Sequence, residues 1–474
     1  MNPTDLAFLP AVEQAQLIRH KEISPAELTQ IYIDRIDQLN PQLGTYFTVM
    51  AEQAIADAIA KTEHLSRAAL DDLPPLFGVT IAIKDLNAVQ GVRYTCGSRA
   101  MADHVSDRDD GVVMKLRQAG CVLLGKTATS EMGSMPFSEP PGFPPARNPW
   151  HTDYTPGGSS GGAASAIAAG LSALAQGSDG GGSIRGPSSC CGIVGIKPAR
   201  GRVSFAPLGD CLSGVATIGP LGRTVTDAAA LLDAMSGYIT GDPYWLPDPT
   251  IPFQQVAQTA IDQAPSAGRI GVVTAIAPLG TVHPDCARAI HHTAKALEAQ
   301  GHQIEAIDLD CSRLVDPFQV VWRAGVKSCG LPPEVLEPIN QWLVSQPDSS
   351  ADYQKAVWAM QIASRQLVAQ LQAYDAVLMP IFMHPTVRVG EWAALSPEAM
   401  MRRVIHWVGP CPIANATGLP AIALPSIRDT NNVPIGVQLL GRPADESRLI
   451  QLAAQLEAAK AWDSDRPSLA TADP

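Results

Sequence analysis

Two glycine-serine stretches organise this sequence: GGSSGG at residues 157–162 and DGGGSIR at residues 179–185. Glycine leaves backbone N–H groups unscreened, so a reacting oxygen can approach them closely. Upstream of both stretches, Lys84 ends the apolar run 81–83. A serine hydroxyl is a weak nucleophile at neutral pH unless a base lies beside it. Two serines, unscreened amides and a lysine in an apolar setting therefore predict nucleophilic acyl transfer that uses no histidine.

Each of these parts also has an ordinary interpretation. GGSSGG alone is typical of a flexible loop. Three consecutive glycines can cradle a phosphate, but no Gly-Lys-Ser/Thr follows them here. A lone lysine is most often a surface charge. Asp179 and Arg185 are interpreted as a pair that braces the loop, and Ser160 as hydrogen-bonding support for it. The combination favours catalysis, whereas no single part does.

Composition limits the classes of function. The 474 residues are 46% hydrophobic and 17% charged, which predicts a packed globular body. The net charge of −12 disfavours nucleic acids and anionic membranes as partners. The start of the chain lacks the pattern of a secretory signal, and the apolar stretch 163–175 is too short to span a bilayer. We therefore expect a cytoplasmic protein with a small-molecule substrate, and the sequence leaves a homodimer open.

Cysteine and histidine usage gives no sign of a metal site. The nine cysteines have irregular spacing and form no C-x-x-C pattern, and the ten histidines are scattered. Cys190 and Cys191 are adjacent and follow the second glycine stretch. Small reduced core residues are the favoured interpretation of the cysteines. We expect neither a metal nor an organic cofactor.

Periodicity and capping signals predict alternating helices and strands. Ser24-Pro25-Ala26-Glu27 begins a helix that we expect to reach about Leu39 and to end at Asn40-Pro41. Residues 78–85 form a β-branched run that predicts a buried strand ending at the lysine. A helix over 110–119 and a strand over 121–126 follow it. A further helix is expected over 163–173 and a strand over 171–176. This succession predicts parallel α/β layering.

The chain divides into five expected parts. A span rich in proline and aspartate, at about 238–268, marks the one seam in the pattern. The parts are an N-terminal helical segment packed on the core (1–70), a catalytic core (71–240), a variable helical and strand subdomain that shapes the substrate pocket (241–370), the C-terminal part of the core (371–462) and a flexible tail (463–474).

Further motifs give the chain a family resemblance. They are GKT (125–127), RNPW (147–150), GIVGIKP (192–198), GRVS (201–204), RTVTD (223–227), TGLPA (417–421) and PIGVQ (434–438). Together with the two glycine-serine stretches, they resemble the amidase signature family of serine hydrolases. The resemblance covers nearly the whole chain and is weakest over about 238–370. It implies an α/β fold, with a single large domain and a mixed twisted sheet covered by helices on both faces.

The resemblance also implies roles for the residues singled out above. Ser183 is the expected acylated nucleophile, Ser159 follows Gly158 across a cis peptide bond and relays protons, and Lys84 is the base. The N–H groups of Ser183 and of Gly180, Gly181 and Gly182 form the expected oxyanion hole. A lysine acts as a base at neutral pH only if burial lowers its pKa, which fits its place at the end of an apolar run.

Two departures from the family pattern concern the substrate. Ala128 stands where the family commonly has asparagine, and Met132 stands where phenylalanine is frequent; the loop 134–141 is also unusual. These positions are expected to line the acyl pocket. The predicted pocket residues are Met135, Pro136, Phe137, Trp322 and Cys329.

Two functions follow from these observations. The first is a free-standing amidase for small apolar or aryl amides, with carbamates (urethanase activity) and esters as further substrates. The alternative is a subunit of a glutamine amidotransferase complex. That role calls for a substrate-binding arginine in a helix rich in Gly, Arg and Tyr, whereas residues 331–370 present apolar groups.

Overall fold

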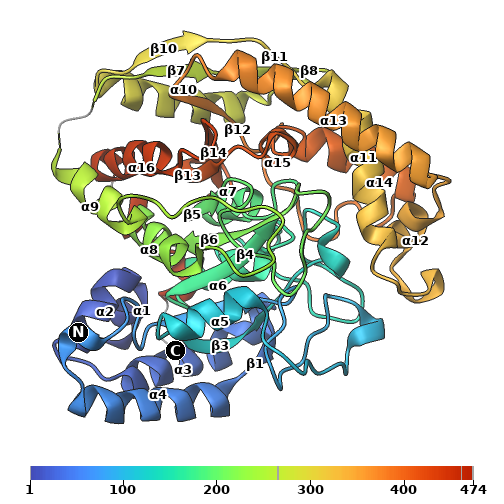
Figure 1. The fold of residues 1–474 in the computed structure, drawn as a ribbon. Helices are drawn as coiled ribbons and strands as arrows, with labels where there is room; N and C mark the ends of the chain where they lie inside the picture. Colours follow the sequence, from blue (N-terminus) through green and yellow to red (C-terminus); the bar gives the residue numbers. More distant parts are fainter. Residues whose placement is uncertain (1, 264–265, 461, 472–474) are drawn as a thin grey trace.

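The computed structural model describes residues 2–263, 266–460 and 462–471. In these residues, eleven strands form one sheet that runs through the molecule, with helices on both faces (Figure 1). The sheet order is β1 (Tyr46–Val49), β3 (Val122–Thr127), β2 (Thr80–Lys84), β4 (Leu174–Asp179), β6 (Thr217–Gly222), β5 (Val194–Lys197), β13 (Ala421–Arg428), β14 (Pro434–Gly441), β12 (Ala376–Pro380), β7 (Arg269–Val272) and β10 (Gln303–Ala306). A small second sheet contains β11 (Leu309–Asp310), β8 (Ala275–Ala277) and β9 (Gly280–Thr281).

The large sheet is mixed, which confirms the predicted α/β fold. Strand β2 pairs in parallel with both β3 and β4, whereas β4 and β6 are antiparallel. The register places Ile83 opposite Gln176. Because parallel strands end at the same edge of a sheet, Lys84 lies beside the last residues of β4.

The helices cover both faces of this sheet (Figure 1). Within the described residues the α-helices are α1 (Pro3–Phe8), α2 (Ala11–Arg19), α3 (Pro25–Leu43), α4 (Ala51–Arg67), α5 (Gly111–Gln118), α6 (Gly161–Ala168), α7 (Arg185–Cys191), α8 (Val225–Met235), α9 (Phe253–Asp262), α10 (Pro284–Ala299), α11 (Ser312–Lys327), α12 (Pro338–Ser345), α13 (Ser350–Leu371), α14 (Pro397–Val408), α15 (Pro412–Thr417) and α16 (Glu446–Lys460). Short 3-10 turns are η1 (Leu70–Asp72), η2 (Arg99–Met101), η3 (Glu131–Gly133), η4 (Pro333–Val335), η5 (Trp462–Ser464) and η6 (Ser468–Ala470).

Helix α3 begins where the sequence predicts and ends later. Ser24 and Glu27 form the expected capping box. The predicted end at Asn40-Pro41 is wrong, because the helix continues to Leu43 and stops at Gly44 in a left-handed conformation. The Asn40 side chain accepts from the N–H of Tyr46 at 2.7 Å, so it fastens the following turn instead of ending the helix.

The segment between the two glycine-serine stretches also differs from expectation. Helix α6 ends at Ala168, five residues before its predicted end, and β4 begins at Leu174 instead of residue 171. Gly170 adopts a positive φ of 64°, a conformation that favours glycine and turns the chain toward the strand. The shift carries β4 up to Asp179, directly before the glycines.

The N-terminal helices and the end of the chain lie together (Figure 1). The Arg35 guanidinium on α3 donates to the carbonyls of Ala169 and Ala470, both at 2.9 Å. Arg466 donates to Asp5 at 2.8 Å. The part of the expected flexible tail that the structure describes is therefore held against α1 and α3, while residues 472–474 lie outside the described residues.

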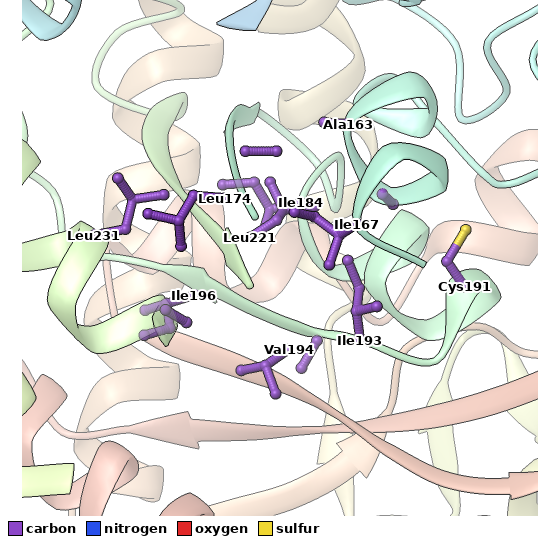
Figure 2. Close-up of a cluster of buried hydrophobic side chains, with 14 of the residues drawn as sticks. Ala163, Ile167, Leu174, Ile184, Cys191, Ile193, Val194, Ile196, Leu221 and Leu231 are labelled. Atoms are coloured by element: carbon purple, nitrogen blue, oxygen red, sulfur yellow. The ribbon is translucent and has the colours of Figure 1, made fainter. Parts of the chain in front are cut away.

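A buried apolar cluster fixes the helices that follow the two serines (Figure 2). Ile167 on α6 and Ile184 just before α7 pack with Val194 on β5 and Leu221 on β6, and all four are at most 1% exposed. Their burial removes the space in which either helix could rotate. The chain segments that carry Ser159 and Ser183 therefore start from a rigid base.

Gly44 offers a test of how closely the N-terminal segment is packed. We expect Gly44→Ala to lower the thermal unfolding midpoint, because an added Cβ would lie 2.5 Å from the carbonyl oxygen of Pro145. Gly91→Ala is the matched control, since Gly91 also has a positive φ, yet a Cβ there meets no atom within 4 Å. Both variants lose about 1–2 kcal/mol from the left-handed backbone, and only Gly44→Ala adds about 1–3 kcal/mol from the clash. Equal midpoints by calorimetry would contradict this packing.

Candidate active site

The structure brings Lys84 and Ser159 into direct contact. Lys84 ends β2 and is fully buried, and Ser159 lies two residues before α6. The Nζ atom of Lys84 donates to the Oγ atom of Ser159 at 2.7 Å. The peptide bond between Gly158 and Ser159 is cis, as the family resemblance implies. Two of the three residues predicted to carry the chemistry are thus hydrogen-bonded neighbours.

Ser178 is a further neighbour of the lysine that the sequence analysis missed. Lys84 Nζ donates to its Oγ at 3.0 Å. Ser178 occupies the position before Asp179 on β4, which lies parallel to β2. The register of two parallel strands brings the pair together, so sequence spacing alone carries no signal for this contact.

Burial makes Lys84 a candidate base. Loss of solvent contact lowers the pKa of Lys84 to about 7, and the negative charge of Asp179 opposes part of that shift. A lysine with an ordinary pKa is protonated at neutral pH and cannot accept a proton. A substantial fraction of Lys84 is therefore an uncharged amine near pH 7.

Ser183 lies two residues before α7 and is 8% exposed. Its carbonyl accepts from the N–H of Ser160 at 3.2 Å, which ties the two serine stretches together. Ser160 Oγ also donates to the carbonyl of Ser178 at 3.1 Å, in keeping with loop support. Among the described residues, no hydrogen bond joins Ser159 Oγ to Ser183 Oγ. Catalytic hydrogen bonds are often long in a ligand-free site and tighten when substrate binds.

The glycines before Ser183 do not all have the expected role. The N–H of Gly182 donates to Asp179 Oδ1 at 2.7 Å. The prediction that Gly182 contributes to an oxyanion hole is therefore not supported, because its N–H already has an acceptor. The N–H groups of Gly180, Gly181 and Ser183 are still candidate donors to the oxyanion. A Cβ on Gly180 would lie 3.0 Å from the Trp322 ring, so the close approach of α11 requires glycine there.

Asp179 and Arg185 form a fully buried ion pair. Arg185 donates to the two carboxylate oxygens at 2.9 and 3.0 Å. Burial alone would raise the pKa of Asp179, but the guanidinium and its hydrogen bonds hold that pKa well below its usual range. The pair thus braces the glycine loop as a charged unit.

Two residues near the end of the chain complete this brace, and the sequence analysis assigned them no role. Arg185 also donates to the side-chain oxygens of Asn415 at 2.6 Å and Gln438 at 2.8 Å. Asn415 in turn donates to Asp179 at 2.9 Å. Gln438 belongs to the PIGVQ motif, and Asn415 lies two residues before the TGLPA motif. The motifs therefore mark this part of the chain, but they do not indicate that its partners are Arg185 and Asp179.

A cavity of about 100 Å³ opens beside Ser183. Its lining is almost entirely apolar and comes from the serine loops, α11, the 381–382 segment, α14 and the start of α15. The lining residues are Ser134, Met135, Pro136, Gly158, Gly181, Gly182, Ser183, Leu279, Cys311, Leu314, Val315, Phe318, Gln319, Trp322, Phe382, Met401, Val404, Ile405, Val408, Gly409, Pro412 and Ile413.

Three of the five predicted pocket residues line this cavity, namely Met135, Pro136 and Trp322. Phe137 does not: its backbone packs on Gly158, and its ring lies edge-on to Trp392 in a separate hollow of about 210 Å³. Cys329 follows the last turn of α11 and is not among the lining residues.

The expectation that Ala128 and Met132 line the acyl pocket is also wrong, since neither belongs to the cavity wall. Ala128 is fully buried, and its backbone contacts the N-terminal turn of α6, where its carbonyl accepts from Gly162. Met132 is held in a 3-10 turn with a φ of 52°.

The described part of the chain holds neither a candidate metal site nor a candidate membrane span. There, no group of three or more His, Cys, Asp or Glu side chains could hold a metal ion. No helix in residues 2–263, 266–460 or 462–471 is both long and apolar enough to cross a membrane. The nine cysteines are free thiols, and Cys190 and Cys191 are buried.

Comparison with known proteins gives consistent matches along the chain. The Amidase family model matches residues 27–450. An inferred amidase of Synechocystis sp. is 47% identical over 455 residues, covering 96% of this chain and 89% of that protein. A glutamyl-tRNA(Gln) amidotransferase subunit of Moorella thermoacetica is 34% identical over 499 residues, covering 99% of this chain and 100% of that protein. The solved structure of 6-aminohexanoate cyclic dimer hydrolase complexed with substrate has a TM-score of 0.89 at 31% identity, covering 98% of this chain and 99% of that one.

The buried brace should be far more sensitive to mutation than an exposed ion pair. We expect Asp179→Ala to lower the free energy of unfolding by about 3–5 kcal/mol, because it leaves the Arg185 guanidinium buried without its counter-ion. The control is Glu398→Ala, which removes a pair with Arg402 whose side chains are both 66% exposed; its expected cost is below about 1 kcal/mol. Chemical denaturation followed by fluorescence measures both. Similar losses in the two variants would contradict the role of the brace.

Proposed function

The chain belongs to the Amidase family, and we propose that it hydrolyses small apolar or aryl amides, with carbamates and esters as further substrates. The observation that carries this proposal is the contact between Lys84 and Ser159, directly after Gly158, which lines the apolar cavity together with Ser183. In the proposal Lys84 is the base, Ser159 is the relaying hydroxyl and Ser183 is the nucleophile. Each of these is a part that acyl transfer needs.

The proposed acylation moves two protons and forms one bond. Uncharged Lys84 accepts the proton of the Ser159 hydroxyl while Ser159 accepts that of Ser183. Ser183 Oγ bonds to the substrate's carbonyl carbon, and the carbonyl electron pair moves onto its oxygen. The N–H groups of Gly180, Gly181 and Ser183 are the proposed donors to that oxyanion, each worth on the order of 10²–10³ in rate.

Collapse of this intermediate releases the first product. The carbonyl re-forms, the bond to the leaving nitrogen breaks, and the nitrogen takes a proton from Ser159, which regains one from the Lys84 ammonium. Water then attacks the acyl-enzyme by the same route and releases the acid. A carbamate would release its alcohol in the first step, and hydrolysis of the carbamoyl-enzyme would give a carbamic acid that splits into an amine and CO₂. Every proton is carried by the protein's own groups or by water.

The cavity lining supports an apolar substrate. None of its described lining residues carries a formal charge. Phe318 and Trp322 stack with their ring centroids 5.9 Å apart and cover one side of it. Covering apolar ligand surface gains about 25 cal/mol per Å². A charged substrate would lose its hydration here and gain no counter-ion in return.

The same lining bears on the alternative function. The relative from Moorella thermoacetica is named as an amidotransferase subunit, and this chain spans its whole length. Free glutamine carries an ammonium and a carboxylate, so a glutamine site needs partners for both charges. The uncharged lining favours a free-standing hydrolase. By its name, the cyclic dimer hydrolase acts on a 6-aminohexanoate dimer, which is compatible with amides of small aliphatic acids.

A substrate panel with active-site labelling tests the proposal. We expect the purified protein to hydrolyse butyranilide, aryl carbamates and nitrophenyl esters faster than glutamine, because the cavity offers apolar surface and no charge. A fluorophosphonate should label Ser183, and Ser183→Ala should abolish both labelling and turnover while the fold persists. Mass spectrometry locates the label. Preferred hydrolysis of glutamine would favour the amidotransferase role, and a label on Ser159 with Ser183 unmodified would overturn the assigned nucleophile.

The rate should follow the titration of Lys84. Below pH 7 the amine is an ammonium and cannot accept a proton, so kcat/KM is expected to rise with pH through a pKa of about 7 and then level off. Lys84→Ala should lose about 10²–10⁴-fold in rate, the usual contribution of a general base.

A second buried lysine supplies the control for this profile. Burial also lowers the pKa of Lys197 to about 7, and its Nζ donates to the carbonyl of Pro198 at 2.8 Å and to neither serine among the described residues. Lys197→Met should keep the rise near pH 7. Lys84 would be ruled out as the base by either of two results. One is a pH profile of kcat/KM that no longer rises near pH 7 in Lys197→Met, and the other is a rise near pH 7 that persists in the residual activity of Lys84→Ala.

A further inference from the structure

Ser134 lies in the wall of the cavity beside Ser183 and has a buried hydroxyl with no hydrogen-bond partner among the described residues. The residue follows the η3 turn and is 4% exposed. Its Oγ atom makes no hydrogen bond to any described residue. Ser134 also belongs to the lining of the cavity beside Ser183. The wall around it is apolar, so Ser134 is one of the few lining residues with a polar side chain, together with Ser183 and Gln319.

The two other serines of this stretch, Ser130 and Ser138, have satisfied hydroxyls. Ser130 Oγ donates to the carbonyl of Met135 and accepts from its N–H, both at 3.1 Å. Ser138 Oγ donates to the carbonyl of Ser159 at 3.3 Å and accepts from the N–H of Gly161 at 3.1 Å. A buried polar group without a partner is unfavourable and rare in folded proteins. Thr129 in this loop also has an unpartnered hydroxyl, but of Thr129, Ser130, Ser134 and Ser138 only Ser134 lines the cavity.

The position of Ser134 places it near the leaving group. A Cβ built on the preceding Gly133 would lie 3.3 Å from Ser159 Oγ, so this turn packs against the proton-relaying serine. Gly180 and Gly181, the candidate oxyanion donors, instead lie beneath the α11 rings of Trp322 and Phe318. In the proposed mechanism Ser159 returns its proton to the leaving nitrogen. A group next to Ser159 is therefore placed to contact that nitrogen.

We propose that Ser134 Oγ accepts a hydrogen bond from the N–H of the leaving nitrogen and so favours amides over esters that share the same acyl group. An ester has an oxygen at this position and no N–H to donate. When an analogue without the N–H binds, the polar group of the site is left buried without a hydrogen-bond partner. A site of this kind therefore discriminates strongly between the substrate and the analogue. The inference rests on the proposed function and names the specificity of that same site.

The test compares butyranilide with phenyl butyrate, which differ only in N–H against O. We expect Ser134→Ala to lower kcat/KM for the anilide at least tenfold more than for the ester. Ser134→Cys, of nearly the same size but a weaker acceptor, should shift the ratio in the same direction, and Ser134→Thr should restore the ratio of the unaltered enzyme. Ser364→Ala is the matched control, because Ser364 on α13 is 7% exposed with an unpartnered Oγ and does not line the cavity. It should leave both rates unchanged.

Stability supplies a readout that separates recognition from scaffolding. Removing an unpaired buried hydroxyl should leave the thermal midpoint of Ser134→Ala unchanged or raise it, while the anilide rate falls. An equal fall for anilide and ester, or a fall for neither, would overturn the role of Ser134. If the unaltered enzyme turned over neither compound and Ser183 resisted labelling, the proposed function itself would fail, and the inference with it.

Discussion

The buried ion pair between Asp179 and Arg185 joins the end of β4 to the first turn of α7 and, through Asn415 and Gln438, to the last third of the chain. Desolvating two charges is unfavourable unless their geometry is good and the remaining hydrogen bonds are made. Here the Asp179 carboxylate also accepts from the N–H groups of Gly182 and Ile184. The loop that carries Ser183 is therefore shaped by its own electrostatics, with little freedom left to the glycines.

The same pair influences the lysine at the end of the neighbouring strand. Burial lowers the pKa of Lys84, and the charge of Asp179 acts in the opposite direction. Because Arg185 lies against Asp179, the carboxylate presents to Lys84 a charge that is largely compensated. Burial then decides the outcome, and the pKa of Lys84 falls to about 7. A serine loop and a basic amine can thus coexist in one buried site because the acid between them is already paired.

The sequence supports some of these features and not others, for identifiable physical reasons. Lys84, Ser159 and Ser183 could be singled out because the chemistry proposed for them needs particular neighbours in the chain, namely an apolar run for the lysine and glycines for the serines. The α/β class follows from local periodicity, whereas the mixed sheet was implied by the family resemblance and differs from the parallel layering that periodicity predicts; both the class and the mixed sheet are confirmed. Ser178 was missed because its contact with Lys84 depends on the register of β2 and β4. Asn415 was missed because it meets Asp179 only after the chain has crossed most of the sheet. Phe137 was predicted to line the substrate cavity but lies in the second hollow. The direction of its ring depends on the packing of its backbone against Gly158, which sequence spacing does not reveal.

Much of the cavity wall comes from the parts of the chain that the motifs describe least. The cavity wall combines α11, which lies where the family resemblance is weakest, with Met401 and Val404 on α14. These helices supply apolar bulk, whereas the hydrogen-bonding groups come from the glycine- and serine-rich loops near the sheet edge. The proposed catalytic groups and the apolar bulk of the cavity thus reside on different elements. Residues on α11 and α14 can change the size of the cavity without disturbing the brace at Asp179, while the Lys84 and Ser159 contact is made by the end of β2 and the turn before α6.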